Sequence, residues 1–326
     1  MESLVFFVAY IIFYIISIPI HELGHLVFGL ITGSRFSSFR LFSFVWYKEN
    51  GCLRFKKSGN RFLLGQCLMV PPENEADFRF VLYNLGGGFF NLLTVAILVC
   101  IALLTGGFNS VLIGGITASA LTGLMNLIPM TIQAPNDGMN VVKALQSPEA
   151  RHAFYVIMQA NNEMMNGKRF RDFDEKLFAL PEQANLRNHF VANLLNWDAA
   201  RLYDSGQYDA CMEKYGDLDL DKLPPYFKHS VQLDYLYYYI VHSPDYDKAR
   251  ALYAQRKMKK YLEAPLPMCT RTHAAYQFFV VGNKSVGREL LQKAKVQIDS
   301  FPNKGLQLME KDYLDQLERL MQAQPR

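Results

Sequence analysis

Charge is scarce in the first 140 residues of the sequence. They hold 8 of the 34 Lys and Arg and 7 of the 30 Asp and Glu, and the remaining residues hold 26 and 23. No dense basic cluster occurs in the chain, which has a net charge of +4, and this excludes the usual kind of nucleic-acid-binding surface. The five cysteines form no Cys-x-x-Cys pair and are consistent with a reducing compartment. The composition predicts a membrane-embedded part, residues 1–140, followed by a soluble part, residues 141–326.

Three stretches in the first part are long and apolar enough to cross a bilayer, which takes about 20 residues. They are residues 4–31, 81–104 and 111–130. The third carries Gly115, Ser119 and Gly123 at four-residue spacing, a pattern that permits close packing of helices. A cleaved signal peptide is not expected, because the first stretch has no basic region before it.

The positive charges predict the orientation of these spans. Eight Lys and Arg lie between the first and second spans, whereas the N-terminal tail and residues 105–110 have none. The positive-inside rule therefore places the N-terminus outside, and residues 34–80 and everything after the third span in the cytoplasm. The short connections between spans favour a bacterial plasma membrane.

The first span contains the residues with the clearest chemical meaning, His21-Glu22-Leu23-Gly24-His25. Two histidines four residues apart lie on one face of a helix, where both can bind one metal ion. Glu22 lies between them, where it can activate a water molecule at such a metal. Charged and ionisable groups are costly at membrane depth and are usually functional there, so the sequence predicts a metal site.

A β region is expected between the first two spans, in residues 34–72. Residues 36–47 roughly alternate and are rich in aromatics, residues 48–51 form a turn signal, and residues 52–55 resume the strand pattern. A further apolar stretch covers residues 62–70. The hairpin is either an ordinary surface element or a sheet beside the active site whose free edge pairs with an extended substrate.

A third metal ligand is expected from the loop after the third span. Asp137 is the only Asp or Glu between residues 80 and 141. Pro129 and Pro135 break the helix and could turn this loop back towards the histidines, with Gly138 relaxing the backbone. The alternative is that residues 136–138 form an ordinary turn.

Residues 1–140 resemble the site-2 protease family of intramembrane zinc metalloproteases. Three motifs carry the resemblance in the expected order. They are H-E-x-x-H at residues 21–25, G-x-x-x-N at residues 87–91, and N-x-x-P at residues 126–129 followed by D-G at residues 137–138. The sequence departs from the family in having Gly88 where a proline is usual, and in a slightly longer gap between Asn126 and Asp137.

The resemblance implies roles for the matching positions. His21, His25 and Asp137 would bind one zinc ion, and Glu22 would act as general base and then as general acid. Asn91 would act in catalysis by helping to position the scissile backbone or by supporting the oxyanion. Four other residues would line or support the cavity: Asn126, Gly87, Pro129 and Gly138.

The second part is expected to be helical. From about residue 187 it carries a weak repeat with a step of about 38 residues, which predicts either a tetratricopeptide-like array or an irregular helical bundle. This part would bind a partner protein or the cytoplasmic tail of a substrate, or would merely stabilise the membrane core.

The sequence as a whole predicts a mainly α, polytopic membrane protein with three transmembrane helices, a small β region and a cytoplasmic helical domain. The expected function is a zinc-dependent intramembrane endopeptidase that cuts a membrane-anchored protein or peptide near the cytoplasmic face. Regulated release of a membrane-bound regulator and processing of signal-peptide remnants are both compatible with it. The alternative is a catalytically inactive membrane scaffold that recruits partners through its helical domain. A metal or proton transporter is disfavoured by the small number of spans.

Overall fold

The computed structural model describes residues 1–57, 64–132, 134–216, 218–299, 301 and 303–324. The chain divides into two compact units, Met1–Asn162 and Glu163–Arg326, and each is described by itself. The protein is mainly helical with one small antiparallel sheet, as the sequence predicts. Residues 141–162, which follow the predicted membrane-embedded part, belong to the first of these compact units.

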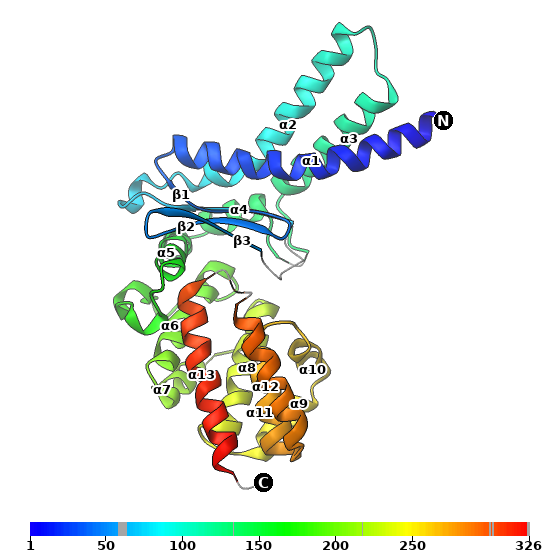
Figure 1. Cartoon of the computed structure of the whole chain (residues 1–326). Helices are drawn as coiled ribbons and strands as arrows, with labels where there is room; N and C mark the ends of the chain where they lie inside the picture. The colour runs from blue at the N-terminus through cyan, green and yellow to red at the C-terminus, as the bar shows by residue number, and fades with distance from the viewer. Residues whose placement is uncertain (58–63, 133, 217, 300, 302, 325–326) are drawn as a thin grey trace. The chain divides into compact units, whose positions relative to one another are not determined.

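Three long helices form the apolar part of the first unit. They are α1 (Glu2–Ile31), α2 (Phe80–Leu104) and α3 (Ser110–Leu127), and each pair of them is in contact (Figure 1). All three lie in segments long and apolar enough to cross a membrane. The third ends at Leu127 and not at residue 130 as expected, because Pro129 disfavours the helical conformation of the residue before it, Ile128.

Small residues allow the three helices to approach closely. A Cβ atom built on Gly24 of α1 would lie 2.2 Å from the carbonyl oxygen of Gly86 in α2. On α3, a Cβ at Gly115 would lie 3.0 Å from the ring of Phe13. The helix crossings therefore depend on residues without side chains, as is usual where helices pack in a membrane.

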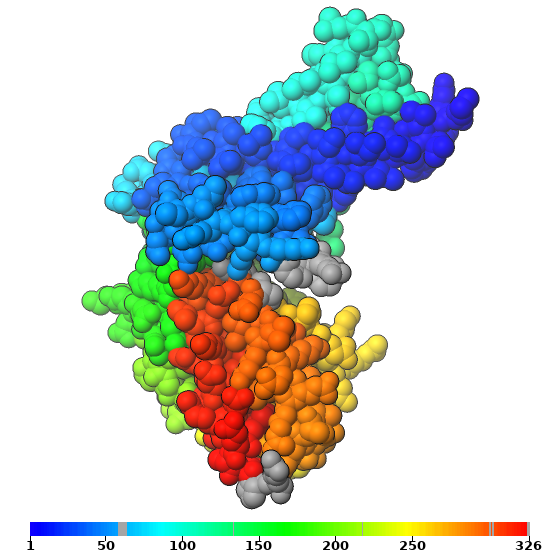
Figure 2. Space-filling view, in the orientation of Figure 1, coloured from blue at the N-terminus to red at the C-terminus, as the bar shows by residue number. Residues whose placement is uncertain are grey.

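A four-stranded antiparallel sheet follows α1, in the order β3-β2-β1-β4, and β1 and β4 contact α1 (Figures 1 and 2). The strands are β1 (Arg35–Leu41), β2 (Phe44–Glu49), β3 (Cys52–Lys57) and β4 (Gly65–Val70). The turn expected at residues 48–51 is present, with Asn50 and Gly51 at positive φ, as a two-residue hairpin turn requires. The expected strand over residues 36–47 is broken by a second turn, in which Phe42 has a φ of 53°. Residues 58–63 of the expected β region lie outside the described residues.

Two further helices complete the first unit. The short α4 (Asp137–Leu145) contacts α2 and α3, and α5 (Pro148–Met165) follows it. The hydroxyl of Tyr155 in α5 donates hydrogen bonds to the carbonyl oxygens of Pro72 and Glu73, at 2.9 and 2.6 Å. These bonds tie α5 to the segment that joins the sheet to α2.

The second unit is built from helices alone in its described part. The second helices of three successive pairs begin at Tyr208, Tyr246 and Lys284, each 38 residues after the last, which agrees with the period expected from the sequence. The tetratricopeptide-like assignment stays a prediction. Figure 2 shows α12 and α13 packed side by side on one face of this unit. The elements are η2 (Phe170–Asp172), η3 (Glu175–Phe178), α6 (His189–Asp204), α7 (Tyr208–Gly216), α8 (Pro225–Val241), α9 (Tyr246–Ala254), α10 (Arg256–Leu262), α11 (Pro267–Ala275), η4 (Tyr276–Val281), α12 (Lys284–Ile298) and α13 (Lys304–Ala323).

Candidate metal centre

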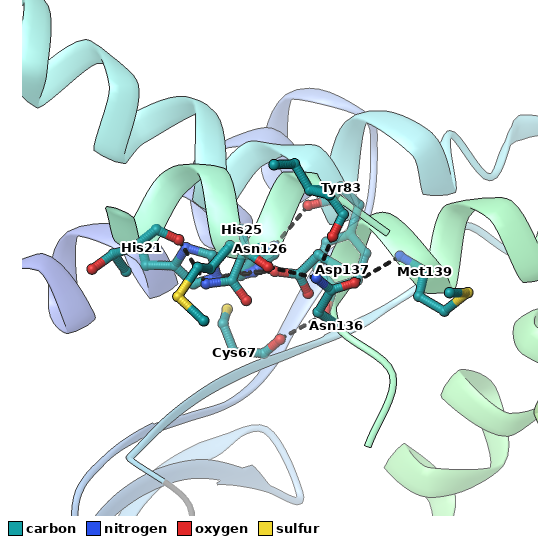
Figure 3. Close-up of polar contacts among 11 residues, drawn as sticks. His21, His25, Cys67, Tyr83, Asn126, Asn136, Asp137 and Met139 are labelled. Carbon is teal, nitrogen blue, oxygen red and sulfur yellow. Dashed lines mark hydrogen bonds and ion pairs between the residues drawn. The ribbon is translucent and has the colours of Figure 1, made fainter. Parts of the chain in front are cut away.

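The two histidines of α1 lie on one helix face and point at the same spot (Figure 3). Their Nε2 atoms are 3.1 Å apart, and the residues are only 7% and 6% exposed. The other ring nitrogen of His25, Nδ1, lies 2.8 Å from the carbonyl oxygen of Tyr83 in α2. A carbonyl only accepts hydrogen bonds, so Nδ1 carries the proton and Nε2 of His25 is left with a lone pair for a ligand.

Asp137 meets both histidines from the other side, as Figure 3 shows. Its Oδ2 atom is 3.0 Å from Nε2 of His21 and 3.4 Å from Nε2 of His25. Burial raises the pKa of the Asp137 carboxyl, but the neighbouring imidazoles outweigh this and hold it well below its usual range. The sequence places Asp137 over 100 residues from the histidines, and the fold brings the three residues together.

Asn136 holds the loop that presents Asp137. Its Oδ1 atom accepts hydrogen bonds from the backbone N–H groups of Met139, at 2.9 Å, and Met130, at 3.1 Å. Its Nδ2 group donates to the carbonyl oxygens of Met125, at 2.6 Å, and Ile128, at 2.7 Å. The first bond caps α4 at its N-terminus, and the last two satisfy carbonyls at the C-terminal end of α3. Asn136 thus joins the end of one helix to the start of the next, and Asp137 is fixed between them.

Gly138 has a different role from the one expected. It lies inside α4 and does not have a positive φ, so it does not relax the backbone. A Cβ atom at this position would instead lie 2.2 Å from the carbonyl oxygen of Leu127. Glycine is required because the start of α4 passes directly over the end of α3. Pro129 follows the C-cap residue of α3, Ile128, and so marks the point where that helix stops.

The three side chains fit a tetrahedral metal ion. Zinc binds His nitrogen and carboxylate oxygen at about 2.0–2.2 Å, so two ligands of a tetrahedral site lie about 3.3–3.6 Å apart. The separations here, 3.0, 3.1 and 3.4 Å, are close to that value. Among the described residues, His21, His25 and Asp137 are the group of His, Cys, Asp and Glu whose ligand atoms converge in this way. Two imidazoles and one carboxylate suit zinc, and also iron and other first-row metals.

Gly87 of α2 leaves room in front of the ligand atoms. A Cβ atom at Gly87 would lie 2.6 Å from Nε2 of both His21 and His25. Any side chain here would fill the space where a metal would sit. This explains in physical terms why the G-x-x-x-N segment begins with glycine.

Asn91 lies one helical turn beyond Gly87 and is completely buried. Neither its Nδ2 nor its Oδ1 atom has a hydrogen-bond partner among the described residues. An unpaired amide at 0% exposure is costly, so this side chain is suited to a partner that arrives from outside. Asn126, by contrast, donates a hydrogen bond to the carbonyl oxygen of Thr122 within its own helix. It also lines a separate cavity of about 280 Å³ between α1 and α3.

The side chain of Glu22 in α1 lies against strand β4. The residue is 7% exposed. A Cβ atom on Gly65 would lie 2.5 Å from its Oε1 atom, so the start of β4 passes against the carboxylate. The backbone of Cys67 in the same strand also lies near this carboxylate. Strand β4 is at the edge of the sheet, and no other described strand pairs with its outer side.

Sequence reasoning missed four residues that build this site. Tyr83 supports both sides of it, since its carbonyl oxygen orients His25 and its hydroxyl donates to the carbonyl oxygen of Cys67 at 2.6 Å. Asn136 fixes Asp137, and Gly65 and Cys67 present β4 to Glu22. Of these four residues, only Asn136 could have been identified from the sequence. Asparagine before an acidic first turn is a common N-cap, which predicts a helix that begins at Asp137.

Comparison of the chain with protein-family models, with curated proteins and with solved structures finds no match.

Proposed function

We propose that the protein is a zinc-dependent intramembrane endopeptidase. The observation that carries the proposal is the convergence of three ligand atoms from His21, His25 and Asp137, all within 4.8 Å of one another, beside the separate carboxylate of Glu22. Three ligands and a nearby base are the arrangement of catalytic zinc sites in hydrolases. A purely structural metal site would not need Glu22, a carboxylate that is not itself a ligand.

The residues divide the chemistry between them. When bound, a zinc ion supplies Lewis acidity, which polarises a carbonyl group and acidifies a water molecule. Glu22 takes a proton from the attacking water and returns it to the nitrogen of the leaving amine. Tyr83 holds His25 in the tautomer that leaves Nε2 available. Asn91 offers an amide with both of its polar atoms unpaired, which can bind a backbone group of the substrate.

Strand β4 suggests how a substrate is presented. A helical membrane segment protects its carbonyl groups with its own hydrogen bonds, so it must unwind before it can be cut. An extended peptide could recover hydrogen bonds at the outer edge of β4, which no described strand pairs, although the carbonyl oxygen of Cys67 there already accepts a bond from the Tyr83 hydroxyl. Gly65 lets the backbone of β4 lie directly against the Glu22 carboxylate, so a peptide paired with β4 would lie close to the base.

The proposed substrate is a membrane-anchored protein or peptide cut near the cytoplasmic face. The three apolar helices fit a location in the membrane, and the site lies in the C-terminal half of α1. The proposed orientation, with the N-terminus outside, rests on the positive charges between the first two spans. The second unit would bind a partner or the tail of the substrate.

Substitution of Glu22 separates a peptidase from an inactive scaffold. The full chain would be reconstituted in liposomes with a set of single-span peptides, and the products would be identified by mass spectrometry. Wild type should produce fragments, and Glu22→Gln should reduce their rate at least 1,000-fold with no loss of bound metal, because only the base is removed. Glu2→Gln, which removes an exposed carboxylate from the same helix, is the matched control. Fragments formed equally fast by Glu22→Gln would contradict the proposal.

The metal is tested by elemental analysis of the purified chain. Wild type should hold close to one zinc ion per chain, and Asp137→Ala should lose most of it because one of three ligands is gone. Equal zinc in both proteins would show that Asp137 is not a ligand. Absence of zinc from wild type purified with zinc present would favour the scaffold.

A further inference from the structure

A cleft of about 530 Å³ lies on the first unit where α2 begins, away from the metal ligands. Its walls come from the 3₁₀ turn η1 (Glu75–Asp77), from the first turn of α2 and from Arg151 of α5. The residues that line it are Glu75, Ala76, Phe78, Arg79, Phe80, Val81, Leu82 and Arg151. Its lining is therefore aromatic and aliphatic, with two cationic side chains and one acidic side chain.

The two arginines carry unneutralised charge. Arg79 and Arg151 are both exposed, and neither guanidinium has a hydrogen-bond or ion-pair partner in the described part of the chain. The acidic member of the lining, Glu75, is already engaged, because its Oε2 atom lies 2.8 Å from Nδ1 of His152. The cleft thus offers two guanidinium groups to an anion. Arginine suits phosphate especially well, because its planar fork donates two parallel hydrogen bonds.

The base of the cleft is firmly packed. The ring of Phe78 lies 6.0 Å from that of Phe80 and 5.5 Å from that of Phe154, measured between centroids. Phe80 and Phe154 are themselves 6.2 Å apart. This cluster joins the start of α2 to α5, so Arg79 and Arg151 are held on one rigid base.

The position along the chain points to the membrane surface. Arg79 immediately precedes α2, which has no charged residue over its 25 residues. If α2 spans the bilayer, Arg79 lies at the level of the lipid headgroups. Three exposed apolar side chains then continue from the cleft along one face of the helix: Leu82, Phe89 and Leu93, exposed by 47%, 51% and 44%. A phosphate bound in the cleft would have an apolar surface directly beside it.

We propose that this cleft binds the phosphodiester of an anionic phospholipid. Arg79 and Arg151 hold the phosphate, and an acyl chain lies along Leu82 and Phe89. Arg79 is one helical turn before Tyr83, whose carbonyl oxygen orients His25, so the bound lipid would also fix the end of α2 that supports the metal site. The inference rests on the membrane location of α2 and is independent of any peptidase activity.

The test is native mass spectrometry of the full chain with phosphatidylglycerol or phosphatidylcholine. Wild type should retain phosphatidylglycerol preferentially. The double variant Arg79→Gln/Arg151→Gln should bind it about 30-fold more weakly, because each arginine near the headgroups contributes roughly a factor of five. Arg79→Lys/Arg151→Lys, which keeps both charges but loses the planar forks, should bind more weakly than wild type and more tightly than the glutamine variant. The matched control is Arg256→Gln/Lys257→Gln, which removes two exposed charges from α10 and should leave binding unchanged.

Three outcomes would overturn the proposal. One is equal phosphatidylglycerol binding by wild type and the double glutamine variant. Another is an equal loss in the α10 control, which would mean that only total charge matters. The third is equal thermal stabilisation of wild type by inorganic phosphate alone, which would assign the cleft to a soluble phosphate ester. If the double glutamine variant fails to fold, Arg151→Gln, on the exposed surface of α5, gives the same comparison with one charge removed.

Discussion

At several positions in this protein glycine is needed because any larger side chain would collide with a neighbouring segment. Gly24, Gly87 and Gly138 each have another backbone or a ligand atom within 2.6 Å of where a Cβ would be. None of the three has a positive φ, so backbone freedom is not the reason for glycine. These residues set the distance between helices and, through it, the distance between the metal ligands.

Gly138→Ala should therefore damage the metal site without removing a ligand. The added methyl group overlaps the carbonyl oxygen of Leu127, so α4 has to shift away from α3 and carry Asp137 with it. We expect metal affinity to fall at least tenfold and stability to fall by about 1–3 kcal/mol. Metal competition titrations and thermal unfolding would measure the two effects. Gly216→Ala is the matched control, because nothing lies within 4 Å of its added Cβ, and it should be nearly neutral.

The buried carboxyl of Asp234 in α8 gives a prediction about pH. Burial raises its pKa to about 7, although Tyr215 donates a hydrogen bond to its Oδ2 atom at 3.1 Å. The pKa in the unfolded chain is about 3.9, so the folded state keeps a proton that the unfolded state loses. The stability that this group contributes is fully present below about pH 4, and is lost as the pH rises through 7.

Asp234→Asn should remove that pH dependence. The variant should match wild type near pH 4 and exceed its stability at pH 8, by up to about 4 kcal/mol. Guanidinium unfolding of the full chain at several pH values would measure the difference. Asp247→Asn alters an exposed carboxylate and should leave the profile unchanged. A profile for Asp234→Asn parallel to that of wild type would disprove the assignment.

At the level of elements, a cluster of ion pairs centred on Arg169 links helices of the second unit. Its guanidinium pairs with Asp204 at the end of α6 and with Asp312 in α13. The Asp204 side chain is 0% exposed and also accepts a hydrogen bond from the backbone N–H of Arg171 at 3.1 Å. The cluster therefore joins the first helices of the unit to its last one, which are far apart in the sequence.

Arg169→Ala should destabilise the second unit strongly. The loss leaves the buried carboxylate of Asp204 without its cation, which typically costs about 3–5 kcal/mol. Fluorescence of Trp197 in a Trp46→Phe background would follow unfolding of this unit, because Trp197 contacts Phe170 and Phe178. Arg250→Ala breaks an exposed pair with Asp247 and should cost under about 1 kcal/mol. Similar losses in the two variants would show that the cluster is not important.

For the whole molecule, the orientation in the membrane is open to a direct test with the native cysteines. Cys52 is exposed in β3, whereas Cys67, Cys211 and Cys269 are buried. Cys100 is exposed but lies within the apolar helix α2. A membrane-impermeant thiol reagent should therefore report mainly on Cys52.

We expect labelling in inverted membrane vesicles and almost none in intact spheroplasts, because the positive charges around the sheet favour the cytoplasmic side. Cys52→Ser should abolish the signal. Labelling from outside would reverse the proposed topology and place the sheet and the metal site on the other face.

The features that could be predicted from the sequence are those fixed by neighbouring residues. Helix geometry alone puts His21 and His25 on one face, and apolar length alone marks three helices that can span a membrane. The turn at Asn50 and Gly51 follows from residues that accept positive φ. Such features depend on contacts within a few residues, and they appear in the fold where the sequence places them.

The remaining features depend on contacts between distant segments. Pro129, Pro135 and Gly138 predict that Asp137 can turn back. Its position, however, is set by the bonds from Asn136 to carbonyls of α3 and by the crossing of α4 over Leu127. Likewise, no local pattern places Gly65 against Glu22, or the carbonyl of Tyr83 against His25. The chemistry of each residue type is local and can be read along the chain, whereas distances and burial arise only when helices and sheet pack together.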